Sequence, residues 1–220
     1  MSLSTVKISY QEIPESQFVN KNCQIEVFDG NCFDGANKYS NSVIHNFTNN
    51  TRPGGPSNLF GDDGILQWHS KSSHTQEDQI IKLYQKNILL YPKFYPICDD
   101  SRVGGEALLY SECNELYPII TIAAPINPNF QNRNTIKTIL NRIKLMLYVS
   151  WKYKKILITG LWGCGAFGAN PQLMVKLWQQ AISESKYLPE KIVFAIIIDS
   201  MSEKWGDSQS IIKEFSNLKV

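Results

Sequence analysis

The 220-residue sequence has no pair of cysteines spaced as C-x-x-C, the spacing that many metal centres and thiol–disulfide oxidoreductases use. It has no apolar run near the roughly 20 residues of a transmembrane helix, and no N-terminal secretory signal. Its cysteines are odd in number, which together with these absences predicts reduced thiols and a cytoplasmic location. They are Cys23, Cys32, Cys98, Cys113 and Cys164.

A strong net charge is also absent, since the formal charge is only +2. So small a charge does not favour nucleic acid or an anionic membrane, and we expect neither as a partner. Hydrophobic residues make up 43% of the chain and charged residues 19%, as in an ordinary globular protein. With no internal repeat or low-complexity linker, we predict a single domain over residues 1–220, acting as a monomer.

Short apolar runs alternate with amphipathic helical patterns. Strands are predicted at residues 5–12, 24–28, 42–48, 107–110, 117–124, 155–159 and 191–198, and helices at 33–39, 75–91, 134–151, 170–181 and 208–218. Asn134 and Asn170 are the predicted N-caps of two of these helices, the second with Pro171 in its first turn. This order predicts an α/β fold with a mixed, mostly parallel central sheet and helices on both faces.

A glycine-rich turn connects strand 155–159 to the helix that opens at Asn170. Its glycines are Gly160, Gly163, Gly165 and Gly168. Glycine permits positive φ and close approach by another group, and free backbone N–H groups near a helix N-terminus bind phosphate. The turn is therefore either a diphosphate site or a tight turn that needs glycine only for its geometry. Its spacing matches neither the dinucleotide-binding motif nor a Walker A loop.

A second glycine- and proline-rich segment, residues 49–75, follows strand 42–48. Both segments leave the carboxyl ends of strands, where α/β sheets collect their ligands. The second ends in Thr75-Gln-Glu-Asp78, which has two interpretations. It is a helix capping box, or it carries functional carboxylates.

Three stretches carry a family resemblance. They are Asn46-Phe-Thr-Asn-Asn-Thr-Arg-Pro-Gly-Gly-Pro56, Gln76-Glu-Asp78, and Gly160-Leu-Trp-Gly-Cys-Gly-Ala-Phe-Gly-Ala-Asn-Pro171. In this order they resemble the microbial-type poly(ADP-ribose) glycohydrolases, which are macrodomain proteins. That family carries Asn-Phe-Ala-x-Ala-x-x-Pro-Gly-Gly-Gly, then Gln-Glu-Glu, then Gly-Ala-Trp-Gly-Cys-Gly-Val-Phe. The resemblance extends from about Ser42 to Phe215, is loose over the first 40 residues, and implies a macrodomain-like three-layer α/β/α fold.

The resemblance also implies a function. It implies hydrolysis of an O-glycosidic ADP-ribose bond on poly- or mono-ADP-ribosylated protein, with no cofactor or metal. The glycine-rich turn at residues 160–168 would hold the diphosphate, and the segment after residue 48 would line the distal ribose. The implied ligand-binding residues are Asn46, Asn49, Gly54, Gly55, Gln76, Gly163, Cys164, Gly165, Ala166, Phe167 and Gly168. Considered alone, Asn46 and Asn49 are also typical turn residues, and Phe167 is also a core candidate, as is Trp162.

The sequence departs from the family pattern around the catalytic acid. Pro56 replaces the third glycine, Asp78 replaces the second glutamate, and the inserted residues 57–75 lengthen the spacing. In the family the second glutamate is the acid and the first binds ribose, so Asp78 and Glu77 are the catalytic candidates. The insertion offers Asp62 and Asp63 as alternative acids.

Three weaker signals leave alternatives. His69 and His74 lack a third ligand for a metal site. Cys164 has no histidine near it in sequence, so we do not expect a nucleophile there. A non-catalytic ADP-ribose-binding domain and a purely structural domain are the alternative functions.

Overall fold

The computed structural model describes residues 3–15, 22–47, 107–113, 116–165, 167–197 and 208–220. The predicted helix at 75–91, the second glycine-rich segment and the insertion lie outside these residues. None of the helices within them is long and apolar enough to cross a membrane.

Seven strands of the described chain form one sheet, in the order β1-β4-β5-β3-β6-β7-β2. Five neighbouring strands, from β5 to β2, run parallel, whereas β1 and β4 pair antiparallel at one edge. The prediction of a mixed, mostly parallel sheet is confirmed. The strands are β1 (Leu3–Ser9), β2 (Gln24–Asp29), β3 (Ser42–Asn46), β4 (Ala107–Cys113), β5 (Leu116–Thr121), β6 (Ile156–Thr159) and β7 (Lys191–Ile196).

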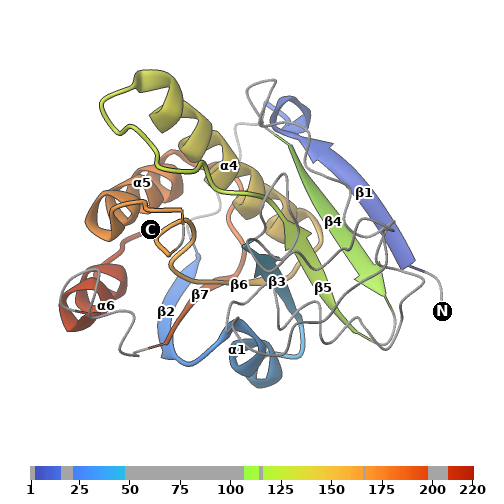
Figure 1. Cartoon of the computed structure of the whole chain (residues 1–220). Helices are drawn as coiled ribbons and strands as arrows, with labels where there is room; N and C mark the ends of the chain where they lie inside the picture. Colours follow the sequence, from blue (N-terminus) through green and yellow to red (C-terminus); the bar gives the residue numbers. More distant parts are fainter. Residues whose placement is uncertain (1–2, 16–21, 48–106, 114–115, 166, 198–207) are drawn as a thin grey trace, which may run out of the picture.

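Helices cover both faces of this sheet (Figure 1), which confirms the three-layer α/β/α prediction. Helix α1 (Cys32–Lys38) packs on one face. The opposite face carries α4 (Arg133–Lys152), α5 (Pro171–Glu184) and α6 (Ser208–Ser216). A short 3-10 helix, η1 (Tyr10–Glu12), follows β1 and contacts α4.

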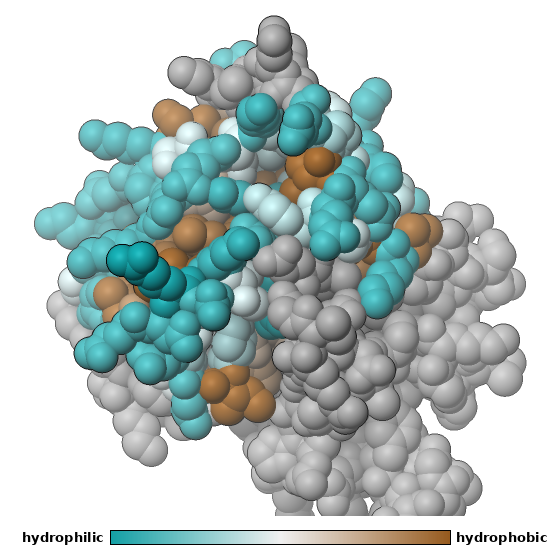
Figure 2. Space-filling model, turned by 90° about the horizontal axis from the view of Figure 1, so that it is seen from above, coloured by the Kyte–Doolittle hydropathy of each residue, from teal (hydrophilic) through white to brown (hydrophobic). Residues whose placement is uncertain are grey.

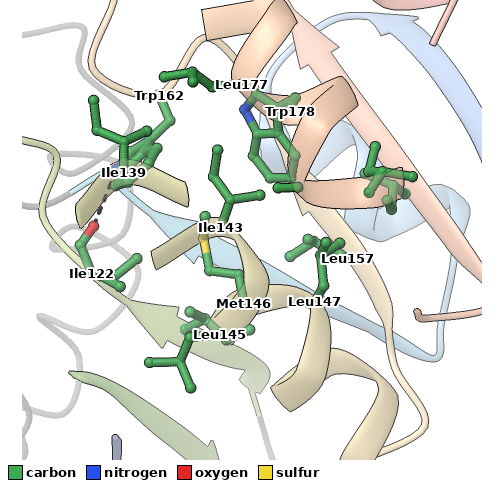
Figure 3. Close-up of a cluster of buried hydrophobic side chains, with 14 of the residues drawn as sticks. Ile122, Ile139, Ile143, Leu145, Met146, Leu147, Leu157, Trp162, Leu177 and Trp178 are labelled. Atoms are coloured by element: carbon green, nitrogen blue, oxygen red, sulfur yellow. Dashed lines mark hydrogen bonds between the residues drawn. The ribbon is translucent and has the colours of Figure 1, made fainter. Parts of the chain in front are cut away.

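The position of β7 inside the sheet explains why nearly all of its residues are apolar. Ile192 and Phe194 point into the core beneath α4 and α5, whereas Val193 and Ala195 face α1, so both sides of the strand are buried. Each fully buried large side chain stabilises the fold by about 1.5–3 kcal/mol. Figure 3 shows how α4 contributes Ile139, Ile143 and Leu147 to this core, against Leu177 and Trp178 of α5.

Polar contacts attach α1 to the other edge of the sheet. Lys38 and Tyr39, at the end of the helix, both donate hydrogen bonds to Glu26 of β2. Burial alone would favour the neutral acid, but these hydrogen bonds and one from Lys191 outweigh it and lower the pKa of Glu26 to about 2. Helix α1 is therefore held to β2 by charge as well as by packing.

Several predicted boundaries differ from those of the structure by one to three residues. Strand β1 ends at Ser9 because η1 begins there, with the Ser9 N–H donating to Glu12 Oε1 at 2.7 Å. Strand β5 ends at Thr121, three residues before the predicted end. The N-cap of α4 is Asn132 and not Asn134, because Asn132 Oδ1 accepts the Asn134 N–H at 2.9 Å.

The other predicted cap is confirmed. Asn170 Oδ1 accepts the Leu173 N–H at 3.0 Å, and Pro171 occupies the first helical position of α5. Because this cap closes the glycine-rich turn, the direction in which the turn enters α5 is fixed by local sequence.

Candidate functional site

Strands β3 and β6 are parallel neighbours near the centre of the sheet, with Val43 aligned to Leu157. Their last residues, Asn46 and Thr159, therefore lie at the same edge, the carboxyl edge of the parallel strands. Asn46 is fully buried and aligned with Thr121 of β5. This edge is where an α/β sheet binds ligands, and the glycine-rich turn begins there.

The glycine-rich turn is a folded loop. Gly163 and Gly168 have φ values of +79° and +71°, which side chains rarely adopt. Two hydrogen bonds close the loop, from Gly168 N–H to the Gly165 carbonyl and from Ala169 N–H to the Gly163 carbonyl, both 3.0 Å. Among the described residues, no hydrogen bond engages the N–H of Gly163, Gly165 or Phe167. Such N–H groups in a curved backbone form a site for an anion.

Gly160 and Gly165 are glycines for different reasons. A Cβ on Gly160 would lie 2.4 Å from the carbonyl oxygen of Ala195, so packing alone requires glycine there. A Cβ on Gly165 would meet no atom of the described residues within 4 Å, and its φ is not in the left-handed region. The purely geometric interpretation therefore accounts for Gly160, Gly163 and Gly168, but not for Gly165.

Gly160→Ala is expected to destabilise the fold, because the backbone of β7 must move to admit the methyl group. An overpacked core position costs about 1–3 kcal/mol, or roughly 2–12 °C in melting temperature for a chain of this size. Gly165→Ala is the matched control and should melt within about 2 °C of the wild type. Equal melting temperatures for the two variants would show that the contact with Ala195 is not tight.

The side chains of the loop divide between core and surface. Cys164 is buried with its thiol toward the Trp162 carbonyl, and burial raises its pKa to about 12. Burial thus keeps the thiol neutral, and the N–H of Cys164 already donates to the Leu161 carbonyl at 3.0 Å. Trp162 is also buried, so it belongs to the core, whereas Phe167 is half-buried and packs against that core.

A second segment, residues 122–132, supports this loop and was not predicted to do so. Asn127 has a φ of +46°, and its N–H donates to the Phe167 carbonyl at 2.7 Å. Its Oδ1 lies 2.6 Å from where a Cβ of Gly168 would be. The flanking prolines in Pro125-Ile-Asn-Pro128 signal a turn, but nothing in the sequence indicates which loop that turn contacts.

Sequence reasoning also missed His45, the residue before Asn46. Its Nδ1 lies 2.9 Å from Thr159 Oγ1 and its Nε2 lies 3.5 Å from the Ile122 carbonyl oxygen. The ring is fully buried, and this burial lowers the pKa of His45 to about 3. A polar side chain within the apolar strand 42–46 was the available signal.

His45 makes the free energy of unfolding depend on pH. The unfolded chain takes up a proton near pH 6.5 but the folded chain only near pH 3, so stability is complete above pH 6.5 and falls as pH drops toward 3. We expect His45→Gln to reduce this slope by up to about 1.4 kcal/mol per pH unit. Chemical denaturation at several pH values would measure it, and parallel stability curves for both proteins would contradict the assignment.

The remaining predicted site residues lie outside the described residues, so their placement stays a prediction. They are the catalytic candidates Glu77 and Asp78, the alternative acids Asp62 and Asp63, and the ligand-binding candidates Asn49, Gly54, Gly55, Gln76 and Ala166. Of the predicted set, the structure brings Asn46 and the glycine loop to one edge.

Three kinds of feature on the described surface could form another site: a cleft, exposed hydrophobic side chains and metal ligands. A cleft of about 430 Å³ lies between residues 10–15, α4 and the end of α5, and no predicted site residue lines it. In Figure 2 the hydrophobic spots are small and separated by hydrophilic side chains. Within the described residues, no group of three His, Cys, Asp or Glu residues could hold a metal ion.

Solved structures of known proteins share the fold of this chain. The chain matches no protein-family model and no curated protein sequence. It is similar in structure to poly(ADP-ribose) glycohydrolase from Deinococcus radiodurans in complex with ADP-ribose, with a TM-score of 0.64 at 18% identity over 96% of this chain and 92% of that one. The enzyme from Thermomonospora curvata gives a TM-score of 0.65 at 18% identity over 96% and 84%. The same values hold for its complex with the inhibitor ADP-HPD.

Each of these neighbours covers 96% of the chain. Their likeness agrees with the residue motifs that the sequence carries at positions 46–56 and 160–171. The chain therefore has the macrodomain-like fold of the bacterial poly(ADP-ribose) glycohydrolases.

Proposed function

We propose that the protein is an ADP-ribosyl hydrolase that cleaves an O-glycosidic ADP-ribose linkage on poly- or mono-ADP-ribosylated protein. The observation that carries the proposal is the loop around Gly165. Its backbone offers the N–H groups of Gly163, Gly165 and Phe167, and the space over Gly165 is open. A diphosphate fits such a loop because its oxygens accept hydrogen bonds from several N–H groups.

The fold neighbours support the identity of the ligand. One is described as a complex with ADP-ribose and another as a complex with the inhibitor ADP-HPD. In this chain, Asn46 at the end of β3 is a ribose ligand in the proposal, since it ends the strand beside the one that leads into the loop. Phe167, which is half-buried in the loop, would contact the distal ribose.

The chemical step needs an acid. Cleavage of the bond at the anomeric carbon passes through an oxocarbenium-like state, and a carboxyl group protonates the leaving oxygen while water attacks the carbon. Asp78 is the proposed acid and Glu77 the proposed ribose ligand, both carried over from the sequence motif. Cys164 takes no covalent part, because its buried thiol stays protonated.

Ligand-induced stabilisation tests the binding half of the proposal. A ligand at a hundred times its dissociation constant raises the free energy of unfolding by about 2.7 kcal/mol, or roughly 5–11 °C in melting temperature. We expect this shift with ADP-ribose. No shift at millimolar ADP-ribose, with a shift by another adenine nucleotide, would assign the site to a different ligand.

Hydrolysis separates the enzyme from the alternative. Asp78 is one methylene shorter than the glutamate of the motif, which is the observation that favours a non-catalytic ADP-ribose-binding domain. Binding without release of ADP-ribose from any modified protein would establish that alternative.

We also propose the cytoplasm as the location of the protein, supported by the buried free thiols of Cys23, Cys32 and Cys164.

A further inference from the structure

A small buried network joins three segments at the carboxyl edge of the sheet. The Ile122 carbonyl oxygen, just after β5, lies 3.3 Å from Trp162 Nε1 and 3.5 Å from His45 Nε2. Figure 3 shows the side chain of Trp162 beside Ile139 of α4, with its hydrogen bond to Ile122 drawn as a dashed line. The other ring nitrogen of His45 lies 2.9 Å from Thr159 Oγ1, at the end of β6. The network thus links the ends of β3, β5 and β6 to the glycine loop.

Chemistry fixes the direction of each hydrogen bond. His45 is fully buried and therefore neutral, so one ring nitrogen donates and the other accepts. A carbonyl oxygen can only accept, so His45 Nε2 carries the proton and donates to Ile122. Nδ1 must then accept, and the donor is the hydroxyl of Thr159. His45 therefore serves as a fixed connector and not as an acid or a base.

The network acts on the residues where the glycine loop starts. Thr159 immediately precedes Gly160. On the side of the sheet that α1 covers, the carbonyl oxygen of Thr159 lies 3.6 Å from Cys32 Sγ. Thr159 is thus held from both faces of the sheet. Two residues beyond Gly160, Trp162 is held through Ile122 and packs against the ring of His45, with a centroid distance of 5.5 Å. The loop's entry is constrained on both sides of Gly160.

Phe47, which precedes the second glycine-rich segment in the sequence, also contacts His45. Its ring meets His45 edge-on, with a centroid distance of 4.8 Å. Its Cζ lies 3.3 Å from the position that a Cβ of Gly160 would take. His45 therefore contacts the chain on its way into the second glycine-rich segment as well as the first residues of the glycine loop.

We propose that His45 is a positioning residue: through Thr159 and Ile122 it holds the glycine loop in the conformation that binds a diphosphate. The inference rests on the proposed function, because it assigns a diphosphate to that loop. It predicts an effect on ligands that contain the diphosphate, and little effect on the adenosine part alone. A merely structural histidine would lower stability and leave this difference in affinity unchanged.

The matched variants are Thr159→Val, which removes the hydroxyl and keeps the branched shape, and Thr159→Ser, which keeps the hydroxyl. Losing one neutral hydrogen bond of about 1 kcal/mol predicts about fivefold weaker binding of ADP-ribose by Thr159→Val. Adenosine binding should change less than twofold, and Thr159→Ser should bind ADP-ribose as the wild type does. Calorimetry with both ligands makes the measurement.

Four results overturn the inference or separate it from the proposed function. Wild-type affinity for ADP-ribose in Thr159→Val, or an equal loss for adenosine, contradicts the positioning role. Absence of ADP-ribose binding by the wild type instead refutes the proposed function. If Thr159→Val does not fold, hydrogen exchange in the wild type decides: the Trp162 indole N–H must exchange more slowly when ADP-ribose is bound, and an unchanged rate contradicts the inference.

Discussion

Gly165→Val is expected to fold normally and to lose its affinity for ADP-ribose. The Cβ of the new side chain would meet no atom of the part of the chain that the structure describes, and the backbone at Gly165 is not in the left-handed region. It would instead occupy the space over the loop and keep a diphosphate from the N–H groups on either side. Losing two hydrogen bonds to a charged group costs about 3–6 kcal/mol, which predicts binding about a hundredfold weaker or more.

The measurement pairs calorimetric titration of ADP-ribose with a melting curve of the free protein. Gly165→Ala provides the graded control, because a methyl group fills less of the space and should weaken binding less. Both variants should melt within about 2 °C of the wild type, since exposed substitutions usually change stability by about 0.5 kcal/mol or less. A folded Gly165→Val protein with wild-type affinity would show that the diphosphate does not bind over this loop.

Asp78→Ala is expected to lose turnover by about a hundred- to ten-thousandfold while keeping its affinity for ADP-ribose. That is the usual contribution of a general acid, which protonates the leaving group and contributes little to binding of the product. Glu77→Ala is expected to weaken both binding and turnover. Adjacent residues on a helix point about 100° apart, so only one of the two carboxylates can face the scissile bond.

Single-turnover release of ADP-ribose, measured beside calorimetry, separates these roles. Asp78→Glu restores the residue of the family motif and should retain activity, which makes it the matched control for loss of the carboxylate. Full activity in Asp78→Ala together with an inactive Asp62→Ala or Asp63→Ala would move the acid into the inserted segment 57–75.

Local sequence predicted the parts of the fold whose causes are local. The apolar run at 191–198 predicted a strand, observed as β7 at Lys191–Ile196, and Asn170 with Pro171 marked the start of α5. The cap of α4 was missed because Asn132 and Asn134 are both favourable caps, and only the geometry of the entering chain selects Asn132. Likewise, the alternation of Val6, Ile8 and Tyr10 continues the pattern of a strand into η1.

The site was predictable where it is continuous in sequence and not where it depends on tertiary contacts. The glycine loop was predicted because four glycines within nine residues, between a strand and a capped helix, indicate a tight turn that a ligand can approach. Which glycine is needed for packing and which for access depends on Ala195, which lies 35 positions beyond Gly160. The pairing of His45 with Thr159 spans 114 positions and follows only from β3 lying beside β6.

Release of free ADP-ribose from labelled poly- and mono-ADP-ribosylated protein is the most direct test of the central claim. The account predicts release by the wild type, and loss of release in both Gly165→Val and Asp78→Ala. A wild-type protein that releases ADP-ribose from none of these substrates would contradict the assignment as a hydrolase, and release that persists in Gly165→Val would contradict the assigned site.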